Sequence, residues 1–172
     1  MNLEEDDLKF IDQLTGIYTK DFFFESGNKI LFLAKRNKVP MSICMIDVDN
    51  LQNINDTYSY AMGNKVLASI AQSIQRECRE SDLVGYLGEG KIGLILYNVS
   101  GINTNIMLNT LRQKIEHDTD IMGQKEISVT VSIGASVMHS LMNTKTLDAA
   151  YDQAYMATNV AKEKGKNCVV IY

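Results

Sequence analysis

The sequence predicts an α/β sandwich, in which a central mixed sheet is flanked by helices. Segments with apolar residues at helical spacing alternate along the chain with short apolar runs that are typical of strands. Two of those runs are joined only by Gly88-Glu89-Gly90, and so short a link makes an antiparallel hairpin. With 172 residues, 45% apolar and 22% charged, the chain suits one globular domain. We assign residues 12–172 to this domain and residues 1–11 to a lead-in or linker.

Four helices are predicted from their apolar stripes. The first spans about Lys20 to Arg36, with Phe23, Ile30 and Ala34 facing inward, and Pro40 lies in the connection that follows it. The other three are marked by apolar or small residues three or four positions apart. These stripes are Leu67, Ile70, Ala71, Ile74 and Cys78; then Met107, Leu108, Leu111 and Ile115; then Leu147, Ala150, Tyr151, Ala154, Thr158 and Ala161.

The predicted strands differ in pattern. An unbroken apolar run at Ile43–Ile46 indicates a strand buried on both faces. Ile127, Val129, Val131 and Ile133 alternate with polar residues, which is typical of a strand with one buried face. The remaining predicted strands are the two arms of the hairpin and a closing strand, at Leu83–Leu87, Ile92–Tyr97 and Cys168–Ile171.

Polar residues follow the buried strand in a pattern that indicates a site. Asp47 and Asp49 come directly after the apolar run, and side chains two apart on a strand point to the same side. Asn55-Asp56-Thr57 is then predicted to form a polar turn, and Gly63-Asn64 to open the next helix. This order favours a nucleotide and metal site. The alternatives are that the two aspartates are solvated acids and that Asn55-Asp56 is a plain turn pair.

Four segments carry a family resemblance, in the family's order. They are Asp12–Ile17 (D-Q-L-T-G-I), Ile46–Asn64 (I-D-V-D-N-L-Q-N-I-N-D-T-Y-S-Y-A-M-G-N), Val129–Gly134 (V-T-V-S-I-G) and Ala161–Asn167 (A-K-E-K-G-K-N). Together they resemble GGDEF domains, the diguanylate cyclases, over nearly the whole chain. The resemblance implies a nucleotidyl-cyclase-like sandwich in which the hairpin carries the name-giving motif.

The resemblance also implies a chemistry. In the family, two copies of the domain face each other, each holding one GTP and divalent metal, and together they make cyclic di-GMP. The metal ligands are an acid at the strand tip, here Asp47, and an acid at the third motif position; a further catalytic acid follows at the fourth. The motif segment here is Gly88-Glu89-Gly90-Lys91-Ile92, so those two positions hold Gly90 and Lys91. We therefore expect no catalytic residues, no cyclase activity, and a weakened Mg²⁺ site with Asp47 as its remaining ligand.

Other positions concern the nucleotide. Asn55 corresponds to the family residue that reads guanine, Lys162 to one that touches the terminal phosphates, and Asn64 stands where the family has an acid. The expected nucleotide-binding positions are therefore Asp47, Asn55, Asn64, Lys91 and Lys162. Lys91 and Lys162 suggest a further hypothesis, that a triphosphate is held here with little or no metal. The alternative is that the lysines of the closing segment form a solvated charge run at a helix end.

A second candidate site lies just before the hairpin. Arg79-Glu80-Ser81-Asp82 matches an R-x-x-D motif that many family members have at this distance from the motif turn, where it binds cyclic di-GMP as an inhibitory site. Arginine suits that role because its planar guanidinium can hold phosphate or a guanine edge in two places. The alternative is a surface salt bridge between Arg79 and Asp82 at a helix end.

Charge and cysteine content limit the function classes. A net charge of −4 argues against binding a nucleic-acid polymer. Cys44, Cys78 and Cys168 are far apart and indicate reduced thiols. No apolar run in this chain approaches a membrane span, and the acidic start, residues 1–7, is unlike a signal peptide. We expect a cytoplasmic protein.

Three interpretations stay open at this point. The favoured one is a catalytically inactive domain that senses cyclic di-GMP or GTP, or binds a protein partner, in bacterial signalling. The second is a residual or altered nucleotidyl cyclase or triphosphatase that acts on GTP or ATP through Asp47 and Asp49. The third is a purely structural dimerisation domain. The resemblance also implies a homodimer and a sensory domain upstream, of which the first residues would be a cut linker.

Overall fold

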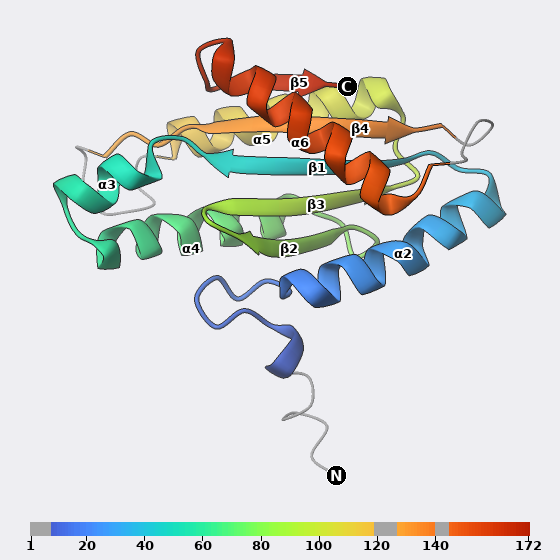
Figure 1. Ribbon diagram of the computed structural model, residues 1–172, viewed down its shortest axis with the longest axis horizontal. Helices are drawn as coiled ribbons and strands as arrows, with labels where there is room; N and C mark the ends of the chain where they lie inside the picture. The colour runs from blue at the N-terminus through green and yellow to red at the C-terminus, as the bar shows by residue number, and fades with distance from the viewer. Residues whose placement is uncertain (1–7, 119–126, 140–144) are drawn as a thin grey trace.

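A computed structural model describes residues 8–118, 127–139 and 145–172 as one α/β sandwich (Figure 1). The strands are β1 (Met41–Val48), β2 (Leu83–Gly88), β3 (Lys91–Tyr97), β4 (Val131–Met138) and β5 (Val169–Ile171). The helices are the short 3₁₀ helix η1 (Leu8–Phe10), α2 (Lys20–Asn37), α3 (Leu51–Thr57), α4 (Tyr60–Glu77), α5 (Gly101–His117) and α6 (Leu147–Glu163).

The sheet has five strands in the order β2-β3-β1-β4-β5. The central strand β1 runs antiparallel to both of its neighbours, β3 and β4, and β5 runs parallel to β4. The predicted mixed sheet and the predicted antiparallel β2–β3 hairpin are both confirmed.

Helices cover both faces of the sheet, with α2 and α6 on one face and α4 and α5 on the other (Figure 1). Alternate residues of β1 therefore enter different cores. Ile43 and Met45 pack under α2 and α6, whereas Cys44 and Ile46 pack under α4 and α5. Continued by one residue, this alternation directs Asp47 to the α6 side of the sheet.

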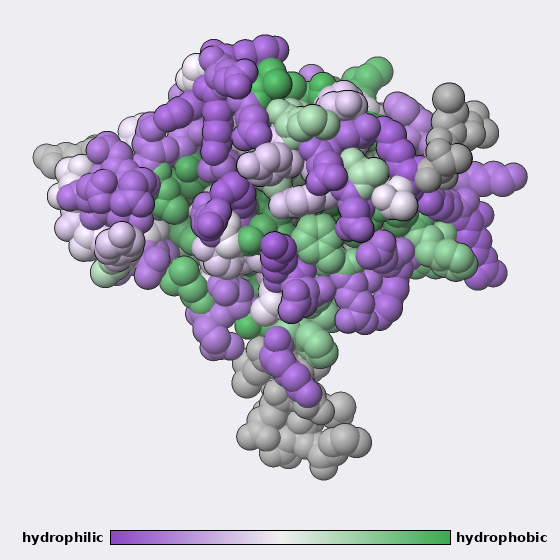
Figure 2. All heavy atoms as spheres, in the orientation of Figure 1, coloured by the Kyte–Doolittle hydropathy of each residue, from purple (hydrophilic) through white to green (hydrophobic). Residues whose placement is uncertain are grey.

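The face that carries α2 and α6 is largely polar on its outside. Figure 2 shows hydrophilic side chains over most of it, with apolar ones in small patches between them. Tyr155, Met156 and Val160 of α6 are among the apolar residues that remain exposed. No helix in the described ranges is long and apolar enough to cross a membrane.

The predicted helices are present, with differences in detail. Helix α2 matches the predicted span within one residue, and Phe23 and Ala34 are buried as expected. Ile30 is only half-buried, and its neighbour Leu31 takes the core position instead. The stripe predicted for α4 is buried except for Cys78, which caps the helix and is half-buried.

Two local predictions between β1 and α4 are wrong. The segment predicted as a polar turn is part of helix α3, which begins at Leu51 directly after Asn50, a residue with left-handed backbone and a φ of 55°. The next helix begins at Tyr60 and not at Gly63-Asn64. Ser59 is its N-cap, and the Ser59 hydroxyl accepts a hydrogen bond from the backbone N–H of Met62.

The strand predicted to alternate is also different. β4 begins at Val131, so Ile127 and Val129 precede it. Its residues from Val131 to Ser136 are all buried, because α6 covers one face and α5 the other. Ser132 and Ser136 are thus buried polar residues, and each donates a hydrogen bond from its hydroxyl.

The N-terminal segment is joined to the sheet edge. Asp12 accepts hydrogen bonds from the backbone N–H and the hydroxyl of Thr15, which closes a tight turn. Tyr18 then pairs with the outer side of β2, donating to Val84 O and accepting from Tyr86 N. Of the predicted lead-in, residues 1–7 lie outside the described residues, and Leu8–Phe10 form only the single turn of η1.

Cys44 is buried, and Cys78 and Cys168 are half-buried. Burial raises the pKa of the Cys44 thiol strongly, and burial together with the nearby Asp82 carboxylate raises the pKa of Cys78 to about 12. Both groups therefore stay protonated near neutral pH. All three cysteines are free, in line with the prediction of reduced thiols.

A test of this fold uses the contact between α6 and the sheet. A Cβ added at Gly134 would lie 2.2 Å from the backbone O of Ala154 and 2.2 Å from the backbone N of Thr158, so helix and strand would have to separate. We expect Gly134→Ala to lower the free energy of unfolding by about 2 kcal/mol or more. The measurement is urea denaturation.

The control for Gly134→Ala is Gly101→Ala. A Cβ at Gly101 would meet Val137 at 3.7 Å, which is ordinary van der Waals contact. This variant is expected to stay within about 0.5 kcal/mol of the wild type. Equal stability of the two variants would show that α6 does not approach β4 as closely as described.

Candidate functional site

The predicted nucleotide and metal site is assembled at one end of the sheet. The C-terminal end of β1, the turn between β2 and β3, helix α3 and the C-terminal end of α6 meet there, on the left in Figure 1. These four segments carry Asp47, Lys91, Asn55 and Lys162, so the fold brings together residues from widely separated parts of the sequence.

The hairpin turn fixes which side chain of the motif segment faces Asp47. Glu89 and Gly90 form the two-residue turn, with φ angles of 53° and 74°, as the tight hairpin turn with two left-handed residues requires. The backbone N–H of Val48 donates to Gly90 O at 3.1 Å, which ties the turn to β1. In this register Lys91 stands directly opposite Asp47, and the Glu89 side chain is 91% exposed.

Two ammonium groups converge on Asp47. The carboxylate is 8% exposed, and its Oδ2 accepts a hydrogen bond from Lys162 Nζ at 2.5 Å. Lys91 Nζ lies 4.0 Å from the same oxygen and 3.5 Å from Glu89 Oε2. The negative charge of Asp47 is therefore matched by cations that belong to the protein.

Asp49 has a different role from the one predicted for it. Its side chain is buried and accepts three hydrogen bonds, from the hydroxyls of Thr130 and Ser132 at 2.7 Å each and from the backbone N–H of Asn167 at 3.1 Å. This carboxylate joins β1, β4 and the segment before β5. The sequence offered no signal for these partners, because they lie more than eighty positions away.

The network continues beyond Asp49 to helix α5. The Asn167 side chain donates to Glu116 and accepts from Arg112, and Arg112 also pairs with Glu116 at 3.0 Å. The Arg112 guanidinium is mostly buried. These contacts hold the C-terminal end of α6 and the chain after it in place beside β1, and so position Lys162.

A divalent metal does not fit the side chains at this end of the sheet. Gly90 has no ligand atom, Lys91 and Lys162 bring positive charge to Asp47, and the oxygens of Asp49 are held by three donors. Mg²⁺ requires several hard oxygen ligands in near-octahedral geometry. Across the part of the chain that the structure describes, no group of three or more His, Cys, Asp or Glu residues could hold a metal ion.

Asn55 and Asn64, the predicted positions near the base, lie on helices α3 and α4. Asn55 lies in the last turn of α3, and its Oδ1 is buried without a hydrogen-bond partner, close to Gly63 of α4. That oxygen faces α4 in this structure. Asn64 lies on the exposed side of α4.

Of the lysines in the closing segment, two have partners. Lys162 bonds Asp47 as described, and Lys166 Nζ donates to Asn50 Oδ1 at 2.5 Å, linking the chain after α6 to the start of α3. Lys164 is exposed. Lys162 is therefore not simply a solvated charge, whereas Lys166 is exposed apart from its contact with Asn50.

The second predicted site is a pocket at the other end of β2. Its volume is about 360 Å³, within the range of small-molecule sites, about 300–1,000 Å³. It is lined by Tyr18, Gln75, Cys78, Arg79, Glu80, Asp82 and Val84.

Asp82 is already engaged in this pocket. Its Oδ2 accepts from the backbone N–H of Arg79 at 2.9 Å, and its Oδ1 accepts from the backbone N–H of Tyr97 at 3.4 Å. The contact between Arg79 and Asp82 is thus a turn hydrogen bond. The alternative predicted from the sequence, a salt bridge between the two side chains, does not form.

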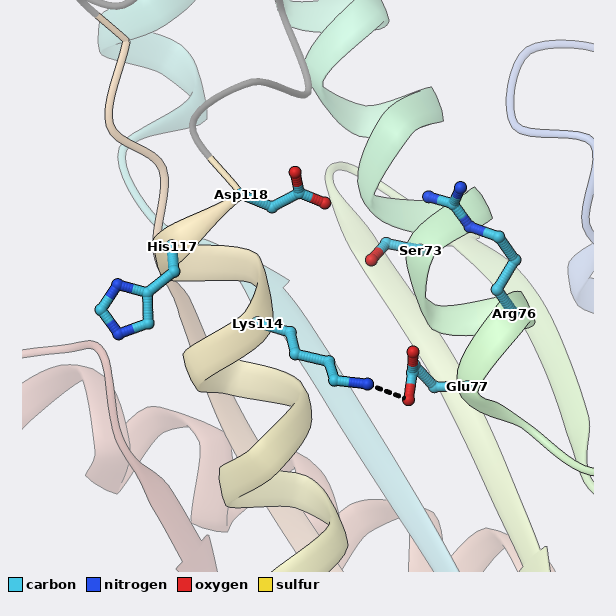
Figure 3. Close-up of a pocket in the computed structure, with 6 residues that line it drawn as sticks. All are labelled: Ser73, Arg76, Glu77, Lys114, His117 and Asp118. Carbon is cyan, nitrogen blue, oxygen red and sulfur yellow. Dashed lines mark hydrogen bonds and ion pairs between the residues drawn. The ribbon is translucent and has the colours of Figure 1, made fainter.

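A larger pocket of about 510 Å³ lies between the C-terminal ends of α4 and α5 (Figure 3). Ser73, Arg76 and Glu77 line it from α4, and Lys114, His117 and Asp118 from α5 and its end. Lys114 donates to Glu77 at 2.6 Å across it. None of the residues predicted to bind a ligand lines this pocket.

The role of Asp49 as a structural residue can be tested. Asp49→Ala leaves the hydroxyls of Thr130 and Ser132 and one backbone N–H without their acceptor. We expect it to lower the free energy of unfolding by about 2–4 kcal/mol. Urea denaturation measures this difference.

The matched control for Asp49→Ala is Asp56→Ala. Asp56 is exposed and accepts one hydrogen bond, from Gln52 within α3. Its removal is expected to change stability by less than about 0.5 kcal/mol. If Asp49→Ala were equally mild, Asp49 would not be the connector between β1, β4 and the chain end.

Comparisons with known proteins agree with this geometry. The family model "Diguanylate cyclase, GGDEF domain" matches residues 9–168. Diguanylate cyclase A of Treponema denticola is 29% identical over 163 residues, which are 93% of this chain and 43% of that protein. The probable diguanylate cyclase DgcT of Escherichia coli K12 is 28% identical over 162 residues, or 93% of this chain and 35% of that protein. The chain thus spans less than half the length of these relatives.

Solved structures show the same fold. Diguanylate cyclase SiaD of Pseudomonas aeruginosa, solved with its activator SiaC, superposes with a TM-score of 0.89 at 26% identity, covering 99% of this chain and 65% of that one. The coiled coil and GGDEF domain of Caulobacter crescentus DgcB superposes at 0.87 with 18% identity, covering 98% of this chain and 88% of that one. The match of the family model over residues 9–168 shows that this chain belongs to the GGDEF domain family of diguanylate cyclases.

Proposed function

We propose that this GGDEF domain is catalytically inactive and serves as a sensor of cyclic di-GMP, which it binds in the pocket of Arg79. The observation that carries the first part is the position of Lys91, whose ammonium group faces Asp47 in the hairpin register. A cyclase of this family needs carboxylates where this chain has Gly90 and Lys91.

The charge balance at Asp47 supports inactivity. Phosphoryl transfer depends on cations that neutralise charge developing on the phosphates and on exact positioning of the two reactants. The lysines can supply charge, but their ammonium groups cannot coordinate an attacking hydroxyl and a phosphate at once as a metal ion does. Asp47 is engaged with Lys162, and Asp49 is engaged with three donors, so neither is available as a replacement catalytic base.

The second part of the proposal rests on the Arg79 pocket. Within the described residues, no ion pair occupies the Arg79 guanidinium, and the pocket has an aromatic side chain, Tyr18, beside the charged groups. A guanidinium suits phosphate or the N7 and O6 edge of guanine, and an aromatic ring suits a base. The structure of DgcB with the same fold is a complex with cyclic di-GMP, which supports the choice of ligand.

The distance between the two sites supports a sensor without catalysis. The pocket lies where β2 begins and the motif turn lies where β2 ends, so substitutions in the turn leave the pocket lining intact. Asp82 has a positioning role in this proposal. Its carboxylate accepts hydrogen bonds from the backbone N–H groups of Arg79 and Tyr97. Each carboxylate oxygen has a second lone pair, which can accept from the N–H donors of guanine.

Binding is tested by calorimetric titration of the wild type and of Arg79→Ala with cyclic di-GMP. A charge-assisted hydrogen bond contributes roughly 1.5–3 kcal/mol, so we expect Arg79→Ala to weaken binding by about one to two decades. Arg79 is exposed, and the melting temperature of the variant should equal that of the wild type.

The matched control is Arg76→Ala. Arg76 is an exposed arginine in the last turn of α4, three positions before Arg79, but it lines the pocket between α4 and α5. It should leave the affinity for cyclic di-GMP unchanged. Equal affinity of wild type and Arg79→Ala, or no binding by the wild type, would reject the sensor and leave a dimerisation or protein-interaction domain.

A further inference from the structure

The carboxylate of Asp47 needs a counter-charge wherever this domain is folded. It is 8% exposed, and a buried carboxylate without a cation nearby is strongly unfavourable. In a metal-binding domain, that cation can be a metal ion taken up from solution. The alternative is a positively charged side chain of the protein itself.

The protein fulfils it with side chains from two other elements. Lys162 comes from the last turn of α6 and lies 2.5 Å from Asp47 Oδ2, and Lys91 comes from the first position of β3 and lies 4.0 Å from the same atom. Both lysines are substantially covered, with side chains 36% and 21% exposed. Asp47 therefore links the central strand, the hairpin and α6 in one ion cluster.

Lys91 also has a weak second contact, with Glu89. The strength of this contact determines the net charge of the group formed by Asp47, Lys91 and Lys162. Its contact with Glu89 Oε2 is 3.5 Å long and involves a carboxylate that is 91% exposed, so water competes for it. Without that contact, two ammonium groups face one buried carboxylate, and the cluster carries an excess of one positive charge. An additional divalent cation at Asp47 would meet this positive charge at close range.

We propose that the ammonium group of Lys91, with that of Lys162, is a built-in substitute for a divalent cation at the end of β1, so that folding and stability of this domain are independent of metal. The hairpin turn is held to β1 and α6 by this cluster. The proposal concerns the end of β1 only, and the sensor proposal can fail without affecting it.

The same geometry predicts how the site could be converted to a metal site. Lys91→Glu replaces the cation opposite Asp47 with a carboxylate, which gives two adjacent acids and one lysine. Two like charges at this spacing repel each other unless a cation is bound between them. A ligand at Gly90 is harder to add, because φ there is 74° and a Cβ would lie 2.8 Å from Leu51 Cδ2.

The test is thermal unfolding of the full chain with EDTA and with millimolar Mn²⁺, followed by titration of Mn²⁺ itself. The wild type is expected to melt at the same temperature in both conditions and to bind no Mn²⁺ stoichiometrically. Lys91→Glu is expected to melt about 2–8 °C lower than the wild type in EDTA and to recover part of that loss in Mn²⁺.

Two further variants separate charge from side-chain size. Lys91→Gln removes the cation without adding an acid, and is expected to melt at a lower temperature than the wild type and to show no response to Mn²⁺. Lys20→Glu makes the same charge reversal at an exposed position in the first turn of α2, and should not create a response either.

The outcomes decide the proposal in each case. A rise of the wild-type melting temperature in Mn²⁺, or Mn²⁺ bound at one equivalent, would overturn it. It would also be overturned if Lys91→Gln were as stable as the wild type. Should Lys91→Glu fail to fold in EDTA, the wild type and Lys91→Gln still give the answer.

Discussion

The pairing of Asp47 with two lysines is the interaction on which the end of the sheet depends. A carboxylate placed at the tip of a strand that is buried on both faces must be neutralised, and the neutralising groups come from β3 and α6. Their approach requires the hairpin register that sets Lys91 opposite Asp47, and it requires α6 to lie close against the sheet at Gly134. The hairpin register and the close packing of α6 on the sheet therefore determine both the fold and the contacts of Asp47.

The two ends of β2 have different chemistry. At the turn end, the side chains are committed to one another, through the Asp47 cluster and through the hydrogen bonds that hold Asp49. At the other end, Arg79 lines a pocket and has no ion pair within the described ranges. The residues around the motif turn are thus held by contacts within the protein, whereas the pocket at the opposite end of β2 is separate from those contacts.

Much of the fold could be predicted from the sequence, because strong periodicity and a short glycine link leave few alternatives. The β2–β3 hairpin and the stripe of α4 are examples. Helix α3 was missed because its seven residues bury only Ile54, so it has no apolar stripe to detect. β4 was misjudged because its serines are buried, and polar residues in a strand normally indicate a solvent face.

The candidate site could be predicted only in part. The opposition of Asp47 and Lys91 follows from hairpin register, which the sequence constrains. The commitment of Asp49 to Thr130, Ser132 and the Asn167 backbone depends on contacts across β4 and the chain end, and no local pattern indicates them. The same holds for Asn55, whose buried oxygen faces Gly63 because α3 is a helix and not a turn.

The most direct test of the central claim is an assay for cyclic di-GMP formation from GTP with Mg²⁺ or Mn²⁺, beside an active GGDEF cyclase. Removing one well-placed electrostatic group in an active site lowers the rate by roughly 10²–10³-fold, and two are replaced here. The account predicts a turnover at least that far below the active cyclase. Sustained product formation that Asp47→Ala abolishes would contradict it, since it would show Asp47 acting in catalysis despite its two lysines.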